Sequence, residues 1–248
     1  MNWVYNHYFG EGPGIQKDAP QPVGLRLLAA VLGREWWDLL KLNLLFIACS
    51  LPIITLPAAY FAMVGICVTM IEDRNVYLWR DFWSAFRARL GITTTLGLLM
   101  GAGVGLSLLA IATYAEAAKS NLLLIMPLAI AITVCVLLPL LGMHVFVALA
   151  KGGDRPLADI LKASAIGLIA RPLPGLAALF VMALFWLAQV YFYPASALLP
   201  VLINFSLGAL VSSFAVLKGV QLGFSNISAE LQQEPTRRPR TQFGVNAQ

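Results

Sequence analysis

The stretch SLPIITLP at residues 50–57 interrupts a long uncharged block that runs from Leu42 to Ile71. As one helix this block would be about 45 Å long, too long for one upright membrane span and too short for two ordinary spans. Pro52 and Pro57 each remove a backbone donor and clash with the preceding turn, so the residues between them are not expected to form regular helix. The pattern favours a short or re-entrant hairpin. Hydropathy alone leaves open whether residues 36–71 cross once, cross twice or re-enter.

Three further uncharged blocks follow this one: Leu90–Ala115, Ser120–Ala150 and Pro172–Leu217. Each exceeds the roughly 20 apolar residues that a helix needs to cross a bilayer. Only 12% of the chain is charged, against about 25% for a soluble domain. The blocks Leu90–Ala115 and Ser120–Ala150 are each predicted to form one span, and Pro127 and Pro139 are expected to kink or tilt the span at Ser120–Ala150. The last block is long enough for two spans, at roughly 172–193 and 198–218.

The basic residues predict the orientation of these spans. If the first block is a hairpin that enters and leaves on one side, every Lys and Arg except Lys119 falls on the same side of the membrane. A single crossing would instead move the four N-terminal basic residues to the other side. Because Lys and Arg are enriched in cytoplasmic loops, this bias favours the hairpin and places both termini in the cytoplasm. We expect a multi-pass protein of the bacterial cytoplasmic (inner) membrane.

The sequence therefore predicts an all-α fold, a polytopic transmembrane helical bundle of five to six membrane helices. The N-terminal hairpin is followed by four full spans, and helices in the cytoplasmic loops lie in the membrane interface. One of these covers residues 78–90, whose aromatic stripe is typical of an interfacial helix; its members are Trp79, Phe82, Trp83 and Phe86. Residues 154–171 show a weaker version. We divide the chain into a polar N-terminal segment (1–35), a membrane domain (36–224) and a disordered cytoplasmic tail (225–248).

Residues with catalytic or ligand-binding chemistry are scarce. The chain has two histidines, and His144 is the ionisable residue at the centre of a span. We expect His144 to be a neutral imidazole bonded to a neighbouring carbonyl, and Asn43, Gln189 and Asn204 to form hydrogen bonds between helices rather than to hold a ligand. The cysteines show no CxxC spacing, and the nucleotide-binding and hydrolase motifs are missing. We expect no enzyme activity, no metal or cofactor, and no nucleic-acid partner.

Glycines repeat at four-residue intervals in the span at 90–115, at Gly97, Gly101 and Gly105. They form one smooth helix face against which another helix can pack closely. That helix can belong to this chain or to a different polypeptide, and both interpretations stay open.

Three segments resemble the YesL-like proteins, a bacterial membrane family without an established function. The first is EGPGI followed by KDAP, at residues 11–20. The second combines Trp37, the LKLNLL segment around Asn43, and SLPIIT at residues 50–55, so that Asn43, Pro52, Thr55 and Pro57 mark the family's break. The third is WRDF at residues 79–82, followed by Phe86. Leu56 departs from the family, which usually has glycine before the proline.

The resemblance implies an accessory role, because genes of this family commonly lie beside those of carbohydrate importers of the ABC class. We therefore expect a non-ATPase membrane subunit that binds the permease subunits of such an importer and is surrounded by membrane lipids. The alternative is a stand-alone carrier or channel for a small solute. Its path would be lined by the Pro52–Pro57 break and His144.

Overall fold

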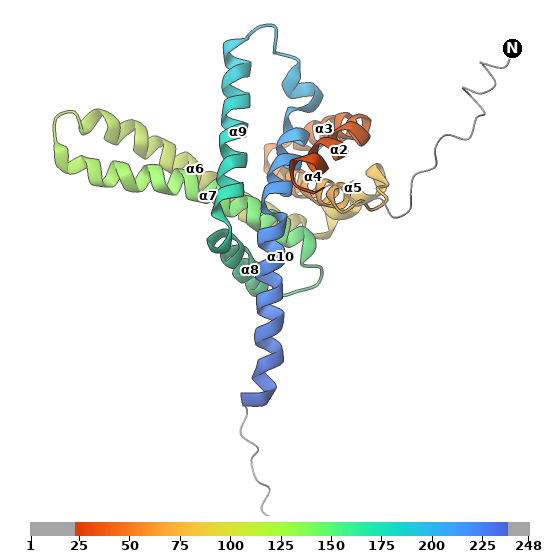
Figure 1. Ribbon diagram of the computed structural model, residues 1–248. Helices are drawn as coiled ribbons and strands as arrows, with labels where there is room; N and C mark the ends of the chain where they lie inside the picture. Colours follow the sequence, from red (N-terminus) through yellow and green to blue (C-terminus); the bar gives the residue numbers. More distant parts are fainter. Residues whose placement is uncertain (1–22, 238–248) are drawn as a thin grey trace, which may run out of the picture.

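The computed structural model describes residues 23–237, and all regular structure in this range is helical. Five helical stretches are long and apolar enough to cross a membrane, which confirms a polytopic helical membrane protein: Ile53–Ile71, Leu90–Ala117, Leu122–Lys151, Pro172–Tyr191 and Pro200–Glu230. The spans predicted from the uncharged blocks correspond to the last four of these. Figure 1 shows that they do not form one parallel bundle, because two helical hairpins point away from a shared body in different directions.

The first block folds into the expected hairpin. Helix α3 (Trp36–Ser50) is followed by the short 3₁₀ helix η1 (Ile53–Thr55) and by α4 (Leu56–Ile71). From their lengths, α3 and α4 are about 22 and 24 Å long, shorter than the hydrocarbon core of about 30 Å. Arg34, just before α3, forms an ion pair of 2.5 Å with Asp73, just after α4. The chain therefore enters and leaves this hairpin at the same end.

The short helix α4 is the centre of the body. In its apolar stretch 61% of the residues are buried, against 6% for the corresponding stretch of the longer span at Leu90–Ala117. It contacts α3 and four helices introduced below: α5, α6, α7 and α10. Ala58, Ala59 and Ala62 are fully buried, and such small side chains let neighbouring helices approach closely.

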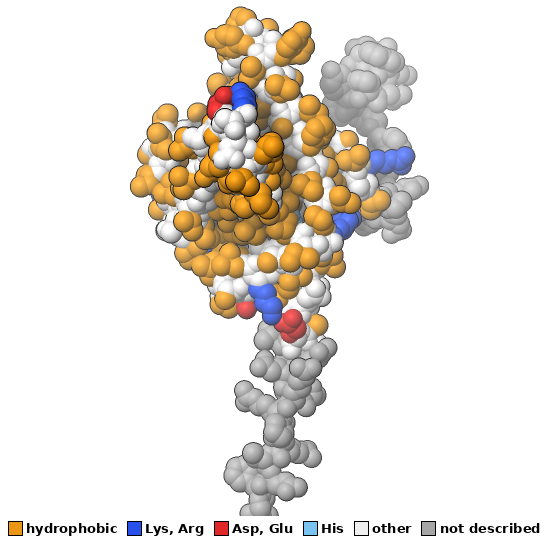
Figure 2. All heavy atoms as spheres, turned by 90° about the vertical axis from the view of Figure 1, so that its left-hand side faces the viewer, with side chains coloured by type: hydrophobic (Ala, Val, Ile, Leu, Met, Phe, Trp, Pro, Cys, Tyr) orange, Lys and Arg blue, Asp and Glu red, His pale blue; other side chains and the backbone are white. Residues whose placement is uncertain are grey.

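A helical hairpin, which we call the arm, extends sideways from the body (Figure 1). It consists of the outer parts of α6 (Leu90–Ala117) and α7 (Ile125–Lys151), joined through η2 (Leu122–Leu124). Pro127 falls in the first turn of α7, where a missing N–H is harmless. The arm's surface is apolar, with exposed leucines such as Leu99, Leu106 and Leu109. Figure 2 views the molecule from the side of the arm and shows hydrophobic side chains over most of that face.

The C-terminal half contributes the second projecting hairpin. Helix α9 (Pro172–Tyr191) rises from the body, and the chain returns through the π-helix η3 (Pro200–Asn204) into α10 (Phe205–Arg237). Helix α8 (Leu157–Ala170) packs along α10. The prediction of a disordered tail from Ser225 was wrong as far as Arg237, because α10 continues to that residue. Residues 238–248 lie outside the described range.

The helix α2 (Leu25–Arg34) also changes the predicted boundaries. It falls within the segment that we predicted to be a separate polar N-terminus. Val31 is buried, and Leu27, Leu28 and Leu32 pack against the same core as α4. The membrane domain therefore begins near residue 25 rather than at residue 36. Residues 1–22, which carry the first family-like motif, lie outside the described range.

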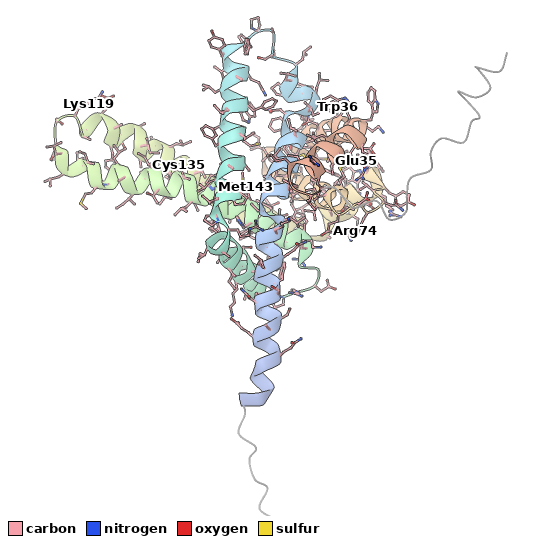
Figure 3. The ribbon with its side chains drawn as sticks, in the orientation of Figure 1. Glu35, Trp36, Arg74, Lys119, Cys135 and Met143 are labelled. Atoms are coloured by element: carbon pink, nitrogen blue, oxygen red, sulfur yellow. The ribbon has the colours of Figure 1, made fainter. Side chains whose placement is uncertain are left out.

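Ion pairs join helix ends at the place where the hairpin closes. Besides Arg34 and Asp73, Glu72 at the end of α4 pairs with Lys151 at the end of α7, at 2.5 Å. We call this region the charged end. In Figure 3, Glu35 and Arg74 lie on this side of the body, whereas Lys119 lies at the tip of the arm, on the opposite side. The charged end and the arm tip are thus separated by the length of the apolar helices.

Candidate functional site

One threonine side chain lies within hydrogen-bonding distance of backbone groups on both sides of Leu51 in the hairpin break. The Thr55 hydroxyl lies 2.6 Å from the carbonyl oxygen of Cys49, at the end of α3, and 2.7 Å from that of Pro52, within reach of a hydrogen bond to either. Pro57 lies in the first turn of α4, where its ring is tolerated. Leu51, Ile53 and Ile54 are largely exposed, an arrangement that suits a hairpin tip inside the bilayer. Pro52 is exposed with them, whereas Pro57 is buried.

Asn43 connects this hairpin to η3 and to the first turn of α10. Its Nδ2 donates to the carbonyl oxygens of Pro200 and Val201, at 3.0 and 2.7 Å. Its Oδ1 accepts a hydrogen bond from the backbone N–H of Ser206 at 3.0 Å. Asn43 is fully buried, and through these bonds it joins α3 to the backbone of another helix, as expected.

The three glycines predicted to form a packing face have different environments. Gly97 packs directly against Pro57, and a Cβ atom at this position would collide with the proline ring. Gly101 and Gly105 have open space around their Cα atoms instead. Gly97 therefore belongs to an internal contact between α6 and the hairpin. The other two glycines lie on the surface of the arm.

A notch of about 230 Å³ lies at the root of the arm, where α6 and α7 meet α4. Tyr60 and Phe146 line one part of it, with their rings 5.4 Å apart and perpendicular. Gly97 and Gly101 line the α6 side. Because glycine has no side chain, this notch leaves room for a side chain of another polypeptide.

The aromatic stripe predicted at residues 78–90 is the helix α5 (Leu78–Ala88). Asp81 caps its start by accepting from the backbone N–H of Tyr77 at 2.9 Å. Phe82 and Phe86 are buried in the core, with their rings stacked. Trp83 is partly buried, and Trp79 is largely exposed. The helix is thus anchored by two of the four aromatic residues and presents the tryptophans at its outer edge.

Residues 39–111 match the family model described as "Protein of unknown function, DUF624". The match covers most of α3, the break, α4, α5 and most of α6. The residues of the break, the three glycines and the four aromatic residues fall inside it, whereas the motif at residues 11–20 and Trp37 lie outside it. Helices α7 to α10 lie outside the match. Comparisons with curated proteins and with solved structures find no match to the chain.

Polar side chains buried between the helices fall into two groups. His144 bonds through Nδ1 to the carbonyl oxygen of Leu140 at 2.8 Å, within its own helix, which confirms the expected bond to a neighbouring carbonyl. The side-chain amides of Gln189 and Asn204 are also buried, and neither has a hydrogen-bond partner among the described residues. Of the expected interhelical hydrogen bonds, the structure shows only that of Asn43.

Sequence reasoning missed a close helix crossing between α8 and α10. A Cβ atom at Gly167 would lie 2.7 Å from the backbone of Gly219, and one at Gly223 would collide with the carbonyl oxygen of Ala163. The spacing did carry a signal, because Ala163 and Gly167 are four residues apart, as are Gly219 and Gly223. Pairs of small residues at this spacing on two helices favour close packing in a membrane.

Proposed function

We propose that this chain is a non-enzymatic accessory subunit that binds the permease subunits of a carbohydrate importer of the ABC class. The class of importer comes from the resemblance to the YesL-like proteins, and the match at residues 39–111 is compatible with that family. The chain contributes no ATPase motif, so energy for transport would come from a partner.

The observation that carries the proposal is the arm with the notch at its root. Two helices extend from the body with few intramolecular contacts on their outer face, and the glycines at 101 and 105 leave that face flat. In lipid, apolar surface alone gives little drive to associate, so helices meet where their surfaces fit closely. A flat glycine surface beside a notch of about 230 Å³ provides such a fit for a helix of the permease.

The proposed orientation places the charged end in the cytoplasm of a bacterial cell, at the inner membrane. Both ends of the N-terminal hairpin and the end of α7 meet there through ion pairs. The basic residues near these ends then lie on the cytoplasmic side, in agreement with the positive-inside rule. The arm tip and the turn between α9 and α10 face the periplasm.

The test is affinity purification of the tagged full chain from its native membranes, followed by mass spectrometry. Permease and ATPase subunits of one importer should co-purify with it. Gly101→Leu fills the arm surface and should reduce this recovery by about tenfold. Gly91→Leu is the matched control, because Gly91 also lies on α6 with open space around it but outside the notch.

A preparation that contains no permease subunit would contradict the proposal. Equal recovery with Gly101→Leu and Gly91→Leu would exclude the arm as the contact. Purified chain that moves a sugar across liposomes without ATP or partner subunits would instead support the alternative, a stand-alone carrier.

A further inference from the structure

A second cavity lies at the far end of α9, where the chain turns toward α10. Its volume is about 410 Å³, within the range of ligand pockets in proteins. Trp186 and Gln189 line it from α9, at a spacing of three residues that places them on one face of the helix, and Tyr193 lines it from the turn that follows. Ser196 and Pro200 line it from the turn.

Gln189 is a buried polar side chain in the wall of this cavity. The residue is only 7% exposed, and neither Nε2 nor Oε1 has a hydrogen-bond partner among the described residues. Ser196 holds the turn in place by donating from Oγ to the backbone oxygen of Gln189 at 2.5 Å. A buried amide without partners costs free energy, and such groups call for an explanation in function or structure. An incoming hydroxyl group would satisfy both its donor and its acceptor.

The composition of the wall restricts the kind of ligand. The residues that line the cavity include no Lys, Arg, Asp, Glu or His, so nothing there compensates a charge on a ligand. A purely apolar ligand would leave the Gln189 amide unpaired. A neutral sugar ring combines the two properties that fit, an apolar C–H face for the rings of Trp186 and Tyr193 and hydroxyl groups for the amide.

We propose that this cavity binds a neutral sugar ring. The inference deepens the proposed function and depends on it for the orientation, in which the cavity faces the periplasm, where the sugar reaches an importer. The same chemistry can come from a free oligosaccharide or from the headgroup of a glycolipid, and the experiment separates these two sources.

The test uses the full chain in phosphatidylcholine nanodiscs, titrated with maltotriose, with cellotriose and with trigalacturonate, a charged sugar. Calorimetry and tryptophan fluorescence should show saturable binding of at least one neutral trisaccharide below about 10 mM and no binding of trigalacturonate. A parallel titration with nanodiscs that contain a glucosyl-diacylglycerol tests the lipid source. Binding of the glycolipid alone would support a sugar-ring site that is supplied from the membrane.

Gln189→Met is the decisive variant. Methionine has nearly the same shape but no hydrogen-bonding amide, so the variant should keep or raise the melting temperature while sugar affinity falls at least about tenfold. Trp186→Ala should also weaken binding, whereas Trp79→Ala, on α5 at the other end of the molecule, should not. The proposal is overturned if no neutral sugar ring binds, if trigalacturonate binds equally well, or if Gln189→Met binds as wild type.

Failure of this inference can be distinguished from failure of the proposed function. Gln189→Met should still recover permease subunits in the affinity purification, because Gln189 lies away from the arm. Sugar binding without permease recovery would refute the accessory-subunit role and leave the sugar site standing. Permease recovery without sugar binding would support the accessory-subunit role and refute the sugar site.

Discussion

Asn43 on α3 forms hydrogen bonds with a part of the chain that is far from it in sequence. Its amide bonds two carbonyl groups of η3 and one N–H group in the first turn of α10, all more than 150 positions along the chain from it. A buried asparagine can satisfy backbone groups that have no partner in their own helix, and in a membrane these groups have no water as an alternative. The side chain therefore joins the matched region at residues 39–111 to a helix outside it.

Replacing Asn43 with leucine should destabilise the protein by about 3 kcal/mol, because buried carbonyl and N–H groups of η3 and α10 lose their partner. The loss is measurable as a lower unfolding midpoint in detergent, followed by circular dichroism. The matched control is Asn121→Leu at the arm tip. Asn121 accepts a single exposed hydrogen bond from Leu123, so its loss should cost about 1 kcal/mol or less. Equal effects of the two changes would contradict the role of Asn43.

The sequence identified Asn43 as a residue that hydrogen-bonds between helices, but not its partners. A π-helix depends on one additional residue in a helical turn, and hydropathy gives no signal for such a local change. For the glycines, the spacing showed a smooth face but not what covers it. Gly97 differs from Gly101 and Gly105 because it contacts Pro57. The position of Pro57 depends in turn on the fold of the break, which the spacing of the glycines does not show.

The elements were more predictable than their contacts. Helix α5 was predicted from the period of its aromatic residues, and the end of α3 from the position of Pro52. Helix α10 is longer than the sequence predicts, because the polar residues after Ser225 are typical of a tail although the helix continues to Arg237. Glu230, on this extension, pairs with Lys162 of α8 at 2.5 Å, and this hydrogen bond raises the pKa of Lys162.

The crossing of α8 and α10 should be sensitive to side-chain size. Gly223→Leu places a bulky side chain where α8 backbone already touches α10, and overpacking of this kind costs about 1–3 kcal/mol or more. Thermal unfolding of the purified protein measures the effect. Gly65→Leu is the control, since Gly65 lies within α4 with open space around its Cα. If both substitutions lower the melting temperature equally, the close crossing is not a determinant of stability.

For the whole molecule, the number and order of the long helices followed from the uncharged blocks and the basic residues. The directions in which these helices run did not follow from the sequence. Hydropathy measures whether a helix can enter a bilayer, but crossing angles depend on which surfaces fit together. The arm of α6 and α7 leaves the body in a direction different from α9 (Figure 1), and no sequence pattern indicated that divergence.

The proposed topology predicts which loops a membrane-impermeant thiol reagent can reach. Cysteines introduced at Ser120, in the arm tip, or at Ala195, in the turn after α9, should be labelled in intact cells. Cysteines introduced at Asn75 or Asp154, near the charged end, should be labelled only after the membrane is permeabilised. All four positions are exposed, so access to the reagent depends on their side of the membrane. Labelling of Asn75→Cys in intact cells would reverse the orientation.

The arm tip also has a consequence for biogenesis. Glu116 and Lys119 form an ion pair of 2.8 Å there, so the short turn that joins α6 to α7 carries no net charge. A neutral turn between two apolar helices is less costly to translocate than one with an isolated charge. The two helices can therefore leave the insertion machinery together as a preformed pair. A newly made chain would then have this pair in the bilayer before α8, α9 and α10 have been synthesised.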